Sequence, residues 1–529
     1  MTYRVLLADS LGAEGFAKLT EQTELEIIAR TDVTKEQLPE ALRGVQGLVV
    51  RSRTKVTADS LKYADDLRVI GRAGIGVDNI DVEAATKLGI VVMNTPGGSN
   101  VTTAEHAVAM VMALARNIPQ AHAAVRAGTW PRERWIGTEL YGKTLGVVGL
   151  GNIGAVVAER ALGLRMKVIA FDPFVTPEMA ARLRVELVSI DDIITRSDFI
   201  TVHTPLTAET KGLLGREALA RTKKGVRIVN CARGGIVDED ALVEAIKSGQ
   251  VAGAALDVFV QEPPPKDSPL LQLDQVIVTP HLGASTGEAQ INVAVAIAQQ
   301  VTDFLVHGTI QNAVNAPSIS PEALRVLRPY LMLSEKLGSL SGQLSSEAPQ
   351  EIQVQASGDI AQRDVRSLAT AAVRGLLAAR LDTGINYVNA PAIAKERGIR
   401  LVEARTPEGG DYVNAVAVQV KTASGTTTVE GAVFAAGMVR VTRINGYKLE
   451  ADPEGHILMC TNRDVPGVVG RLGTLLGESG INIANIELGR EKIGGMALSL
   501  IHVDDAVPEA VLAKLRTFPE IVSAQLLRL

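Results

Sequence analysis

The stretch TLGVVGLGNIGAVVAERALGL, residues 144–164, decides how this chain folds. An apolar run leads into Gly149, Gly151 and Gly154, and a helix-like stretch follows them at once. In such a pattern the first glycine permits a tight turn, the second lets the backbone approach a pyrophosphate, and the third lets helix and strand pack closely. The first helical turn, which begins with Asn152 and Ile153, offers free N–H groups and a positive dipole to phosphates. The segment predicts a strand–turn–helix unit that binds a dinucleotide.

The next apolar run, KVIAFD (167–172), ends in Asp172. A carboxylate at the end of this strand can accept hydrogen bonds from the ribose hydroxyls of the dinucleotide and would repel a 2′-phosphate. No arginine or lysine follows immediately. The pattern therefore favours NAD over NADP as the cofactor.

Short apolar runs alternate with helix-like stretches on both sides of this unit, from residue 1 to about 95 and from 144 to 281. Such runs are typical of parallel strands buried on both faces, so the sequence predicts an α/β protein with two Rossmann-like, doubly wound lobes. Long helices are predicted over 102–127 and 287–305, and a strand-like segment over 309–315. We expect residues 1–97 plus 287–317 to form a discontinuous substrate-binding domain, and 98–286 to form an NAD-binding Rossmann domain.

The alternation of apolar runs and helix-like stretches ends after Pro317. Residues 318–452 mix strand-like runs with a helix over 321–344 and one further helix, and they contain no catalytic motif, which predicts an α+β intervening domain. Residues 456–529 follow the order βαββαβ, the ferredoxin-like arrangement.

Composition narrows the class of protein further. A chain of 529 residues is too long for one core. A net charge of −5 gives no argument for nucleic acid or a membrane surface as a partner, and no stretch approaches the roughly 20 apolar residues of a membrane span. Two cysteines cannot form a disulfide framework, and the N-terminus resembles a first strand more than a signal peptide. We expect a cytoplasmic protein without a metal site.

Three residues stand just past predicted strands: Arg233 in NCARGG, Glu262 in DVFVQEPP and His281 in VTPHLGAS. Ligands of doubly wound sheets bind at this end of the strands. A histidine has the pKa of a general base, a nearby carboxylate can orient its ring, and an arginine can hold a substrate carboxylate bidentately. Each residue alone could equally be an ordinary loop or ion-pair residue. Together they predict the oxidation of a 2-hydroxy acid.

Other residues near these strand ends carry weaker signals. Asp257 could hydrogen-bond the nicotinamide carboxamide. Cys231 is expected to be a small buried residue beside the cofactor and not a nucleophile. His203 is expected to be structural or on the cofactor side, and His106 to be a packing residue on the long helix.

With these motifs, residues 1–317 resemble the D-isomer-specific 2-hydroxyacid dehydrogenases. The whole chain resembles their long-form 3-phosphoglycerate-oxidising members, which carry an intervening domain and a C-terminal ACT domain matching 318–452 and 456–529. The resemblance implies NAD-dependent oxidation of 3-phospho-D-glycerate to 3-phosphohydroxypyruvate, the first step of L-serine biosynthesis, with Arg233, Glu262 and His281 as the catalytic residues. It implies a cofactor site that includes the glycine turn and is lined by Ile75, Asn152, Ile153, Asp172, Thr204, Cys231, Ala232, Arg233, Asp257 and His281.

The resemblance also implies substrate and effector residues. Arg51, Ser52 and Asn100 match positions that hold the substrate from the N-terminal lobe, and Arg53, Arg132 and Arg134 offer further positive charge. Asn462, Asp464 and Asn482 match the site where L-serine bridges two ACT domains, which implies feedback inhibition in a homodimer or homotetramer. Other members have His or Tyr at position 462, so a module that only dimerises is the alternative.

The sequence is also compatible with two other functions. One is a related reductase acting on 2-oxoglutarate, hydroxypyruvate or glyoxylate. The other, from a different class, is an NAD-sensing binding protein built on the same fold.

Overall fold

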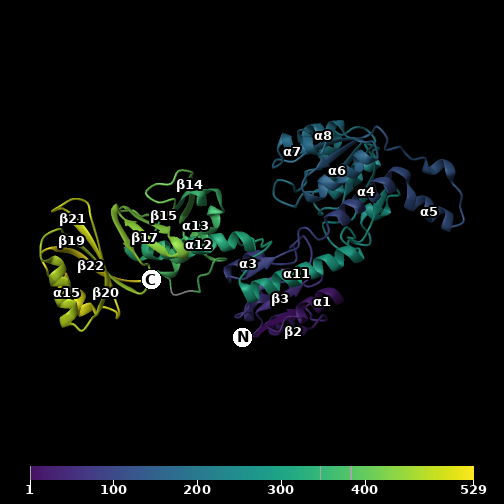
Figure 1. Ribbon diagram of the computed structural model, residues 1–529. Helices are drawn as coiled ribbons and strands as arrows, with labels where there is room; N and C mark the ends of the chain where they lie inside the picture. Colours follow the sequence, from purple (N-terminus) through teal and green to yellow (C-terminus); the bar gives the residue numbers. More distant parts are fainter. Residues whose placement is uncertain (1, 346, 382–383) are drawn as a thin grey trace.

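The computed structural model describes residues 2–345, 347–381 and 384–529, which form four β-sheets in succession along an elongated molecule (Figure 1). The predicted fold class is confirmed: two parallel, Rossmann-like sheets are followed by a mixed sheet and an antiparallel sheet. No helix in the described part of the chain combines the length and apolar character that a membrane crossing requires.

The first sheet is parallel, with the strand order β2-β1-β3-β4-β5. Apolar clusters cover both of its faces, which explains why its strands are continuous apolar runs. Its elements are β1 (Tyr3–Leu7), α1 (Ala13–Thr20), β2 (Leu25–Ala29), α2 (Leu38–Ala41), β3 (Gly47–Val50), β4 (Val69–Arg72), α3 (Val82–Lys87) and β5 (Val91–Met93). Helix α11 (Gly287–His307) returns from far along the chain to cover one face. Ile297 and Val301 of α11 lie where a side chain at Gly71 of β4 would be, so the glycine permits close packing.

The second sheet is also parallel, with the order β12-β11-β10-β9-β6-β7-β8. Its strands are β6 (Thr144–Val148), β7 (Lys167–Phe171), β8 (Glu186–Leu187), β9 (Phe199–Val202), β10 (Val226–Asn230), β11 (Val251–Leu256) and β12 (Val276–Val278). Its helices are α4 (Asn100–Arg116), α5 (Ile118–Arg126), α6 (Asn152–Gly163), α7 (Pro177–Arg182), α8 (Ile190–Arg196), α9 (Arg216–Ala220) and α10 (Glu239–Lys247). The strand order reverses at β6, between β7 and β9, and such a switch point is where doubly wound sheets bind ligands.

Three sequence-based assignments were wrong. The helix predicted over 102–127 is two helices, α4 and α5, because Asn117 between them has a left-handed backbone (φ 51°) and Pro119 restarts the second helix. The segment predicted as a strand over 309–315 forms only an isolated bridge between Ala313 and Met93. The described part of residues 351–450 contains two α-helices, where one helix was predicted.

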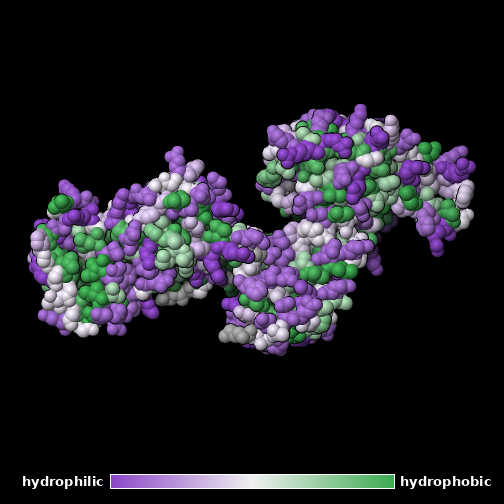
Figure 2. All heavy atoms as spheres, in the orientation of Figure 1, coloured by the Kyte–Doolittle hydropathy of each residue, from purple (hydrophilic) through white to green (hydrophobic). Residues whose placement is uncertain are grey.

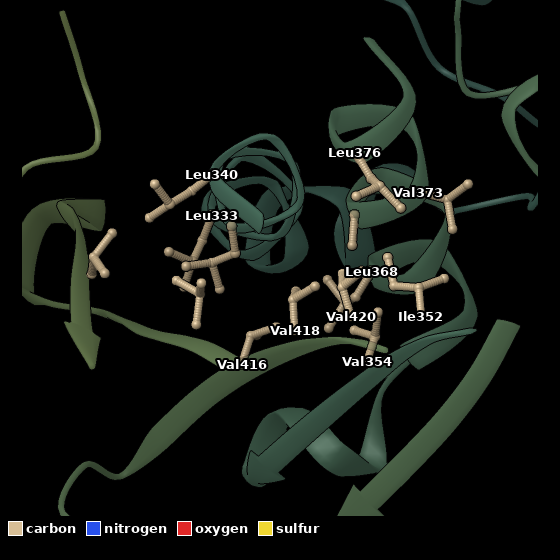
Figure 3. Close-up of a cluster of buried hydrophobic side chains, with 14 of the residues drawn as sticks. Leu333, Leu340, Ile352, Val354, Leu368, Val373, Leu376, Val416, Val418 and Val420 are labelled. Atoms are coloured by element: carbon tan, nitrogen blue, oxygen red, sulfur yellow. The ribbon is translucent and has the colours of Figure 1, made fainter. Parts of the chain in front are cut away.

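The third sheet, with the order β14-β13-β15-β16-β17-β18, is covered on one face by helices α12 and α13. Leu333 and Leu340 of α12, Leu368 of α13 and Val418 of the sheet meet in this core (Figure 3). The elements are α12 (Pro321–Leu344), β13 (Glu351–Gly358), α13 (Val365–Ala378), α14 (Ala390–Glu396), β14 (Arg400–Thr406), β15 (Asn414–Lys421), β16 (Thr426–Val433), β17 (Val439–Ile444) and β18 (Tyr447–Ala451).

The fourth sheet confirms the predicted βαββαβ order, with strands arranged β20-β21-β19-β22. Its elements are β19 (His456–Arg463), α15 (Val468–Glu478), β20 (Ile483–Arg490), β21 (Met496–Val503), α16 (Glu509–Leu515) and β22 (Ile521–Arg528). Helices α15 and α16 cover one face. On the other face, Ile457, Met459 and Leu500 are buried in the same apolar cluster as the third sheet and α12. The two C-terminal domains therefore share one hydrophobic core.

Candidate active site

The glycine turn between β6 and α6 has the shape of a phosphate cradle. Gly149 has φ 91°, and a Cβ there would lie 2.7 Å from the carbonyl oxygen of His203. A side chain at Gly154 would collide with the carbonyl group of Gly149, whereas nothing lies within 4 Å of the position where Gly151 would carry one. Gly151 is also the N-cap of α6, and no side chain caps the helix. The space above Gly151 and the uncapped N–H groups of Asn152 and its neighbours fit a pyrophosphate.

Two polar groups beside this turn also fit a dinucleotide. Asp172 accepts hydrogen bonds from the backbone N–H groups of Leu150 (2.8 Å) and Phe174 (2.9 Å), so it ties the glycine turn to the loop after β7. A carboxylate has about four acceptor positions, which leaves room for ribose hydroxyls. The buried hydroxyl of Thr204 has no hydrogen-bond partner among the described residues, and a buried polar atom of this kind is suited to a ligand.

Asp257, directly after β11, is the most connected residue of the site. Its fully buried carboxylate accepts hydrogen bonds from the Thr279 hydroxyl (2.6 Å) and from the backbone N–H groups of Leu282 (2.7 Å) and Gly283 (2.8 Å). Its own carbonyl oxygen accepts from the backbone N–H of His281 (3.0 Å). Burial raises the pKa of Asp257, but the hydrogen bonds from His106, Thr279, Leu282 and Gly283 outweigh burial and hold the pKa below its ordinary value. Asp257 is therefore an anion that fixes the segment 279–283.

His281 lies in this segment, with a left-handed backbone (φ 55°). Its Nδ1 is 2.8 Å from Oε2 of Glu262, whose other oxygen accepts from the backbone N–H of Phe259 (3.1 Å). Because the carboxylate accepts the hydrogen of Nδ1, Nε2 is left as a proton acceptor. The imidazole is 52% exposed, so Nε2 can meet a ligand that enters from solvent.

Arg233 comes from the same sheet, but its side chain contacts the first lobe. Its Nε donates to Oδ2 of Asp78 (2.9 Å) and its Nη1 to the carbonyl oxygen of Ala232 (2.7 Å). A side chain at Gly76 would collide with the guanidinium, so this glycine makes room for it. In the part of the chain that the structure describes, no hydrogen bond joins Arg233 to His281 or Glu262. The structure thus pairs His281 with Glu262, and it pairs Arg233 with Asp78 of the first lobe.

Of the other predicted substrate residues, Arg51 and Ser52 lie in the first lobe, and Asn100 begins the first helix of the second lobe. The backbone N–H of Arg51 donates to Oδ2 of Asp9 (2.6 Å), and Arg51 lines a cavity of about 230 Å³ together with Ala73 and Gln290. Ser52 is exposed, and Asn100 is the first residue of α4. Two of the additional arginines are held by carboxylates of the protein, because Arg53 pairs with Asp9 (2.8 Å) and Arg134 with Asp274 (2.5 Å).

His203, Cys231 and His106, which also lie near the strand ends, differ in their surroundings. His203 is hydrogen-bonded to Thr201 (2.9 Å), and burial lowers its pKa to about 4, so it is neutral near pH 7. Burial and the nearby Asp257 raise the pKa of the Cys231 thiol far above its ordinary value, which excludes a thiolate nucleophile. His106, expected to be a packing residue, instead places Nε2 at 3.3 Å from both Asp257 and Thr279.

The predicted effector residues each have partners within the C-terminal domain. Asn462 is 2% exposed, accepts from the Ser499 hydroxyl (3.0 Å) and donates to the carbonyl oxygen of Arg463 (2.9 Å). Asp464 accepts from the backbone N–H of Gly494 (3.2 Å). Asn482 donates to Asp504 (2.7 Å). No hydrogen bond joins these three residues to one another within the described ranges.

Replacement of Asp257 by Asn should loosen the segment that carries His281. An amide nitrogen cannot accept from a backbone N–H, so one buried donor loses its partner, at a cost of about 1–3 kcal/mol. We expect faster hydrogen–deuterium exchange at residues 279–283, measured by mass spectrometry, with Asp274→Asn on the exposed surface as the control. Since the pKa of Asp257 is lowered in the folded protein, this stability is present above about pH 4 and is lost as the pH falls further. Unchanged exchange at 279–283 would contradict the role of this carboxylate.

Family models and individual relatives match this chain along its length. The NAD binding domain of D-isomer specific 2-hydroxyacid dehydrogenases matches residues 108–283, the D-3-phosphoglycerate dehydrogenase intervening domain matches 326–445, and the ACT domain matches 456–520. The D-3-phosphoglycerate dehydrogenase of Bacillus subtilis is 42% identical over 527 residues, covering 100% of both chains. That of Methanocaldococcus jannaschii is 44% identical over 527 residues, covering 99% of this chain and 100% of its own.

Solved structures resemble about three fifths of this chain. The TT0316 protein from Thermus thermophilus is 35% identical, with a TM-score of 0.54, over 59% of this chain and 99% of its own. The NAD-dependent formate dehydrogenase from Staphylococcus aureus, solved in complex with NAD, is 30% identical, with a TM-score of 0.54, over 60% of this chain and 100% of its own. This chain is thus an NAD-dependent oxidoreductase. It belongs to the D-3-phosphoglycerate dehydrogenase family.

Proposed function

We propose that this protein oxidises 3-phospho-D-glycerate to 3-phosphohydroxypyruvate with NAD, as the first step of L-serine biosynthesis. The observation that carries the proposal is the identity of 42–44% to the named relatives over the full length, including both C-terminal domains. The histidine–carboxylate pair, whose Nδ1 and Oε2 atoms are 2.8 Å apart, follows strands of the same sheet as the glycine turn and supports the chemistry. A related reductase of 2-oxoglutarate, hydroxypyruvate or glyoxylate would use the same pair but has no need of a phosphate site.

In this proposal His281 is the general base. Its Nε2 accepts the proton of the C2 hydroxyl, while NAD bound at the glycine turn supplies the hydride acceptor. Glu262 accepts the hydrogen of Nδ1, with its Oε2 at 2.8 Å from the Nδ1 atom, and stabilises the imidazolium that forms. Proton transfer to a positioned base contributes typically about 10²–10⁴-fold to an enzymatic rate. The pair therefore accounts for proton removal, and the orientation of the hydroxyl must come from the groups that bind the acid.

Arg233 is proposed to bind the substrate carboxylate. An arginine has five N–H donors, and two of them are used by Asp78 and Ala232. The remaining donors leave a face for a carboxylate without breaking the contact to the first lobe. We propose that Arg51, Ser52 and Asn100 complete the substrate site, with residues 1–97 and 287–317 acting as the substrate-binding domain and 98–286 as the NAD-binding domain.

The cofactor residues in this proposal comprise the turn and its surroundings. Gly149, Gly151 and Gly154 with Asn152 and Ile153 would receive the pyrophosphate, and Asp172 the ribose. The nicotinamide half would lie along the residues Ile75, Thr204, Cys231, Ala232 and Asp257.

We propose that the C-terminal domain senses L-serine. The whole protein is proposed to be a homodimer or homotetramer in the cytoplasm. Apolar residues gather on the surface of this domain in Figure 2, and Val469 of α15 with Ile486 and Leu488 of β20 are among its exposed apolar side chains. Such residues are suited to a subunit contact. Asn462, Asp464 and Asn482 would bind the effector there, and Asn462 would have to exchange a buried hydrogen bond to do so.

Replacement of His281 by Ala should lower kcat for 3-phosphoglycerate oxidation by about 10²–10⁴-fold, because the general base is lost. The measurement is NADH formation at 340 nm, with cofactor binding followed separately by NADH fluorescence, which should not change. His122→Ala, on the exposed face of α5, is the matched control. Unchanged turnover in His281→Ala would remove this residue from the chemistry. Cofactor binding by the wild type without turnover of any 2-hydroxy acid would favour an NAD-sensing protein.

Replacement of Asn482 by Ala should abolish inhibition by L-serine, because the side chain that would bind the amino acid is gone. Basal activity should be unchanged, since Asn482 lies in the C-terminal domain and its side chain forms a hydrogen bond only with Asp504 among the described residues. Inhibition curves with L-serine and with D-serine would measure the effect. A loss of basal activity would instead indicate a role for Asn482 in assembly.

A further inference from the structure

A cavity of about 550 Å³ lies where the first lobe meets the intervening domain. One wall is the segment that follows α11, with Ile310, Ala316 and Ile319, and the other wall is α12, with Leu324 and Leu331. Small-molecule sites typically have volumes of about 300–1,000 Å³. None of the lining residues belongs to the cofactor, substrate or effector sites proposed above. The cavity is therefore a separate candidate site.

The hydroxyl groups that line the cavity are already used by the protein. The Ser367 hydroxyl donates to the carboxylate of Asp364, and the Thr370 hydroxyl donates to the carbonyl oxygen of Arg366 (3.0 Å). Ser367 and Thr370 belong to α13, and both are buried. Because these hydroxyls have partners, the interior offers mainly an apolar surface to a ligand.

The charged residues of the lining are not balanced. Among the described residues, Glu335 is the one carboxylate that lines the cavity. It forms an ion pair with Arg374 and accepts a hydrogen bond from the Tyr387 hydroxyl (2.5 Å), so its charge is already neutralised. Arg328 and Lys336 also line the cavity, and within the described ranges no carboxylate oxygen lies within 4 Å of either cation. The cavity thus combines apolar walls with two cations that lack a counterion.

We propose that this cavity binds an apolar carboxylic acid, with its chain between the two walls and its carboxylate at Lys336 and Arg328. Burial of the chain would supply most of the affinity, and the two cations would select the anionic end. His307, at the end of α11, is a third basic residue of the lining. Met332 also lines the cavity and is 43% exposed, and its unbranched side chain can adjust to a ligand. A small hydrophilic anion would leave the apolar walls without a partner.

A bound acid would contact both domains at their connection. Residues 308–320 link α11 of the first lobe to α12, and several of them line the cavity. A ligand that packs against them should restrict their local opening. We therefore expect slower hydrogen–deuterium exchange at residues 308–320 when the acid is bound. This site is independent of the proposed function, because its test measures binding and not turnover.

The test is isothermal titration calorimetry of the full-length protein with decanoate and, separately, with 1-decanol. The wild type should bind decanoate more tightly than 1-decanol. Lys336→Met should weaken decanoate binding by about 10-fold, the lower end of the range for hydrogen bonds to charged groups, without weakening 1-decanol binding. Ala316→Phe should fill the cavity and abolish the binding of both molecules. Lys421→Met, at an exposed lysine that ends β15 and does not line the cavity, is the matched control and should bind decanoate like the wild type.

Four outcomes would overturn the proposal. The first is a wild type that does not bind decanoate. The second is binding that Ala316→Phe leaves intact, because the molecule would then lie elsewhere. The third is equal affinity for decanoate and 1-decanol with no effect of Lys336→Met, which would indicate a site for neutral apolar molecules. The fourth is a change of molar mass in Ala316→Phe, measured by analytical ultracentrifugation, without decanoate binding to the wild type, which would make the cavity a subunit contact.

Thermal unfolding of each variant separates these outcomes from misfolding. Lys336 has no carboxylate partner among the described residues, so Lys336→Met should unfold at the temperature of the wild type. The comparison of decanoate with 1-decanol in this variant tests the charge preference even if Ala316→Phe does not fold.

Discussion

The buried carboxylate of Asp257 is the interaction on which the geometry of the site depends. It ends one strand of the second sheet and accepts hydrogen bonds from Thr279, Leu282 and Gly283, so the segment with His281 is held against the neighbouring strand end. Buried backbone N–H groups need such an acceptor. With the segment fixed, Nδ1 of His281 meets Glu262 and its Nε2 remains open to a ligand. Asp172 fixes the glycine turn in a similar way, because it accepts hydrogen bonds from two backbone N–H groups.

An ion pair between Arg233 and Asp78 connects the two lobes. Arg233 of the second lobe is 30% exposed and Asp78 of the first is 72% exposed, so their ion pair is weak as a source of stability. The ion pair instead positions the guanidinium of Arg233 over Gly76, where some of its N–H groups can still donate to a ligand.

Local patterns in the sequence were sufficient for much of this arrangement. The GLGNIG turn, the strand ends before Arg233, Glu262 and His281, and the βαββαβ order all depend on residues close together in the chain, and the structure has the predicted elements there. The break at Asn117 was missed, although Pro119 is a signal for it. Contacts between distant segments had no comparable signal: Asp78 and Arg233 are 155 positions apart, and His106 and Thr279 are 173 apart.

In the proposed reaction a hydride leaves C2 of 3-phosphoglycerate for the cofactor bound at the glycine turn. The most direct measurement uses 3-phosphoglycerate carrying deuterium at C2, with mass spectrometry of the reduced cofactor after turnover. We expect one deuterium in each molecule of NADH formed. NADH without deuterium, with the label found in the solvent, would contradict it.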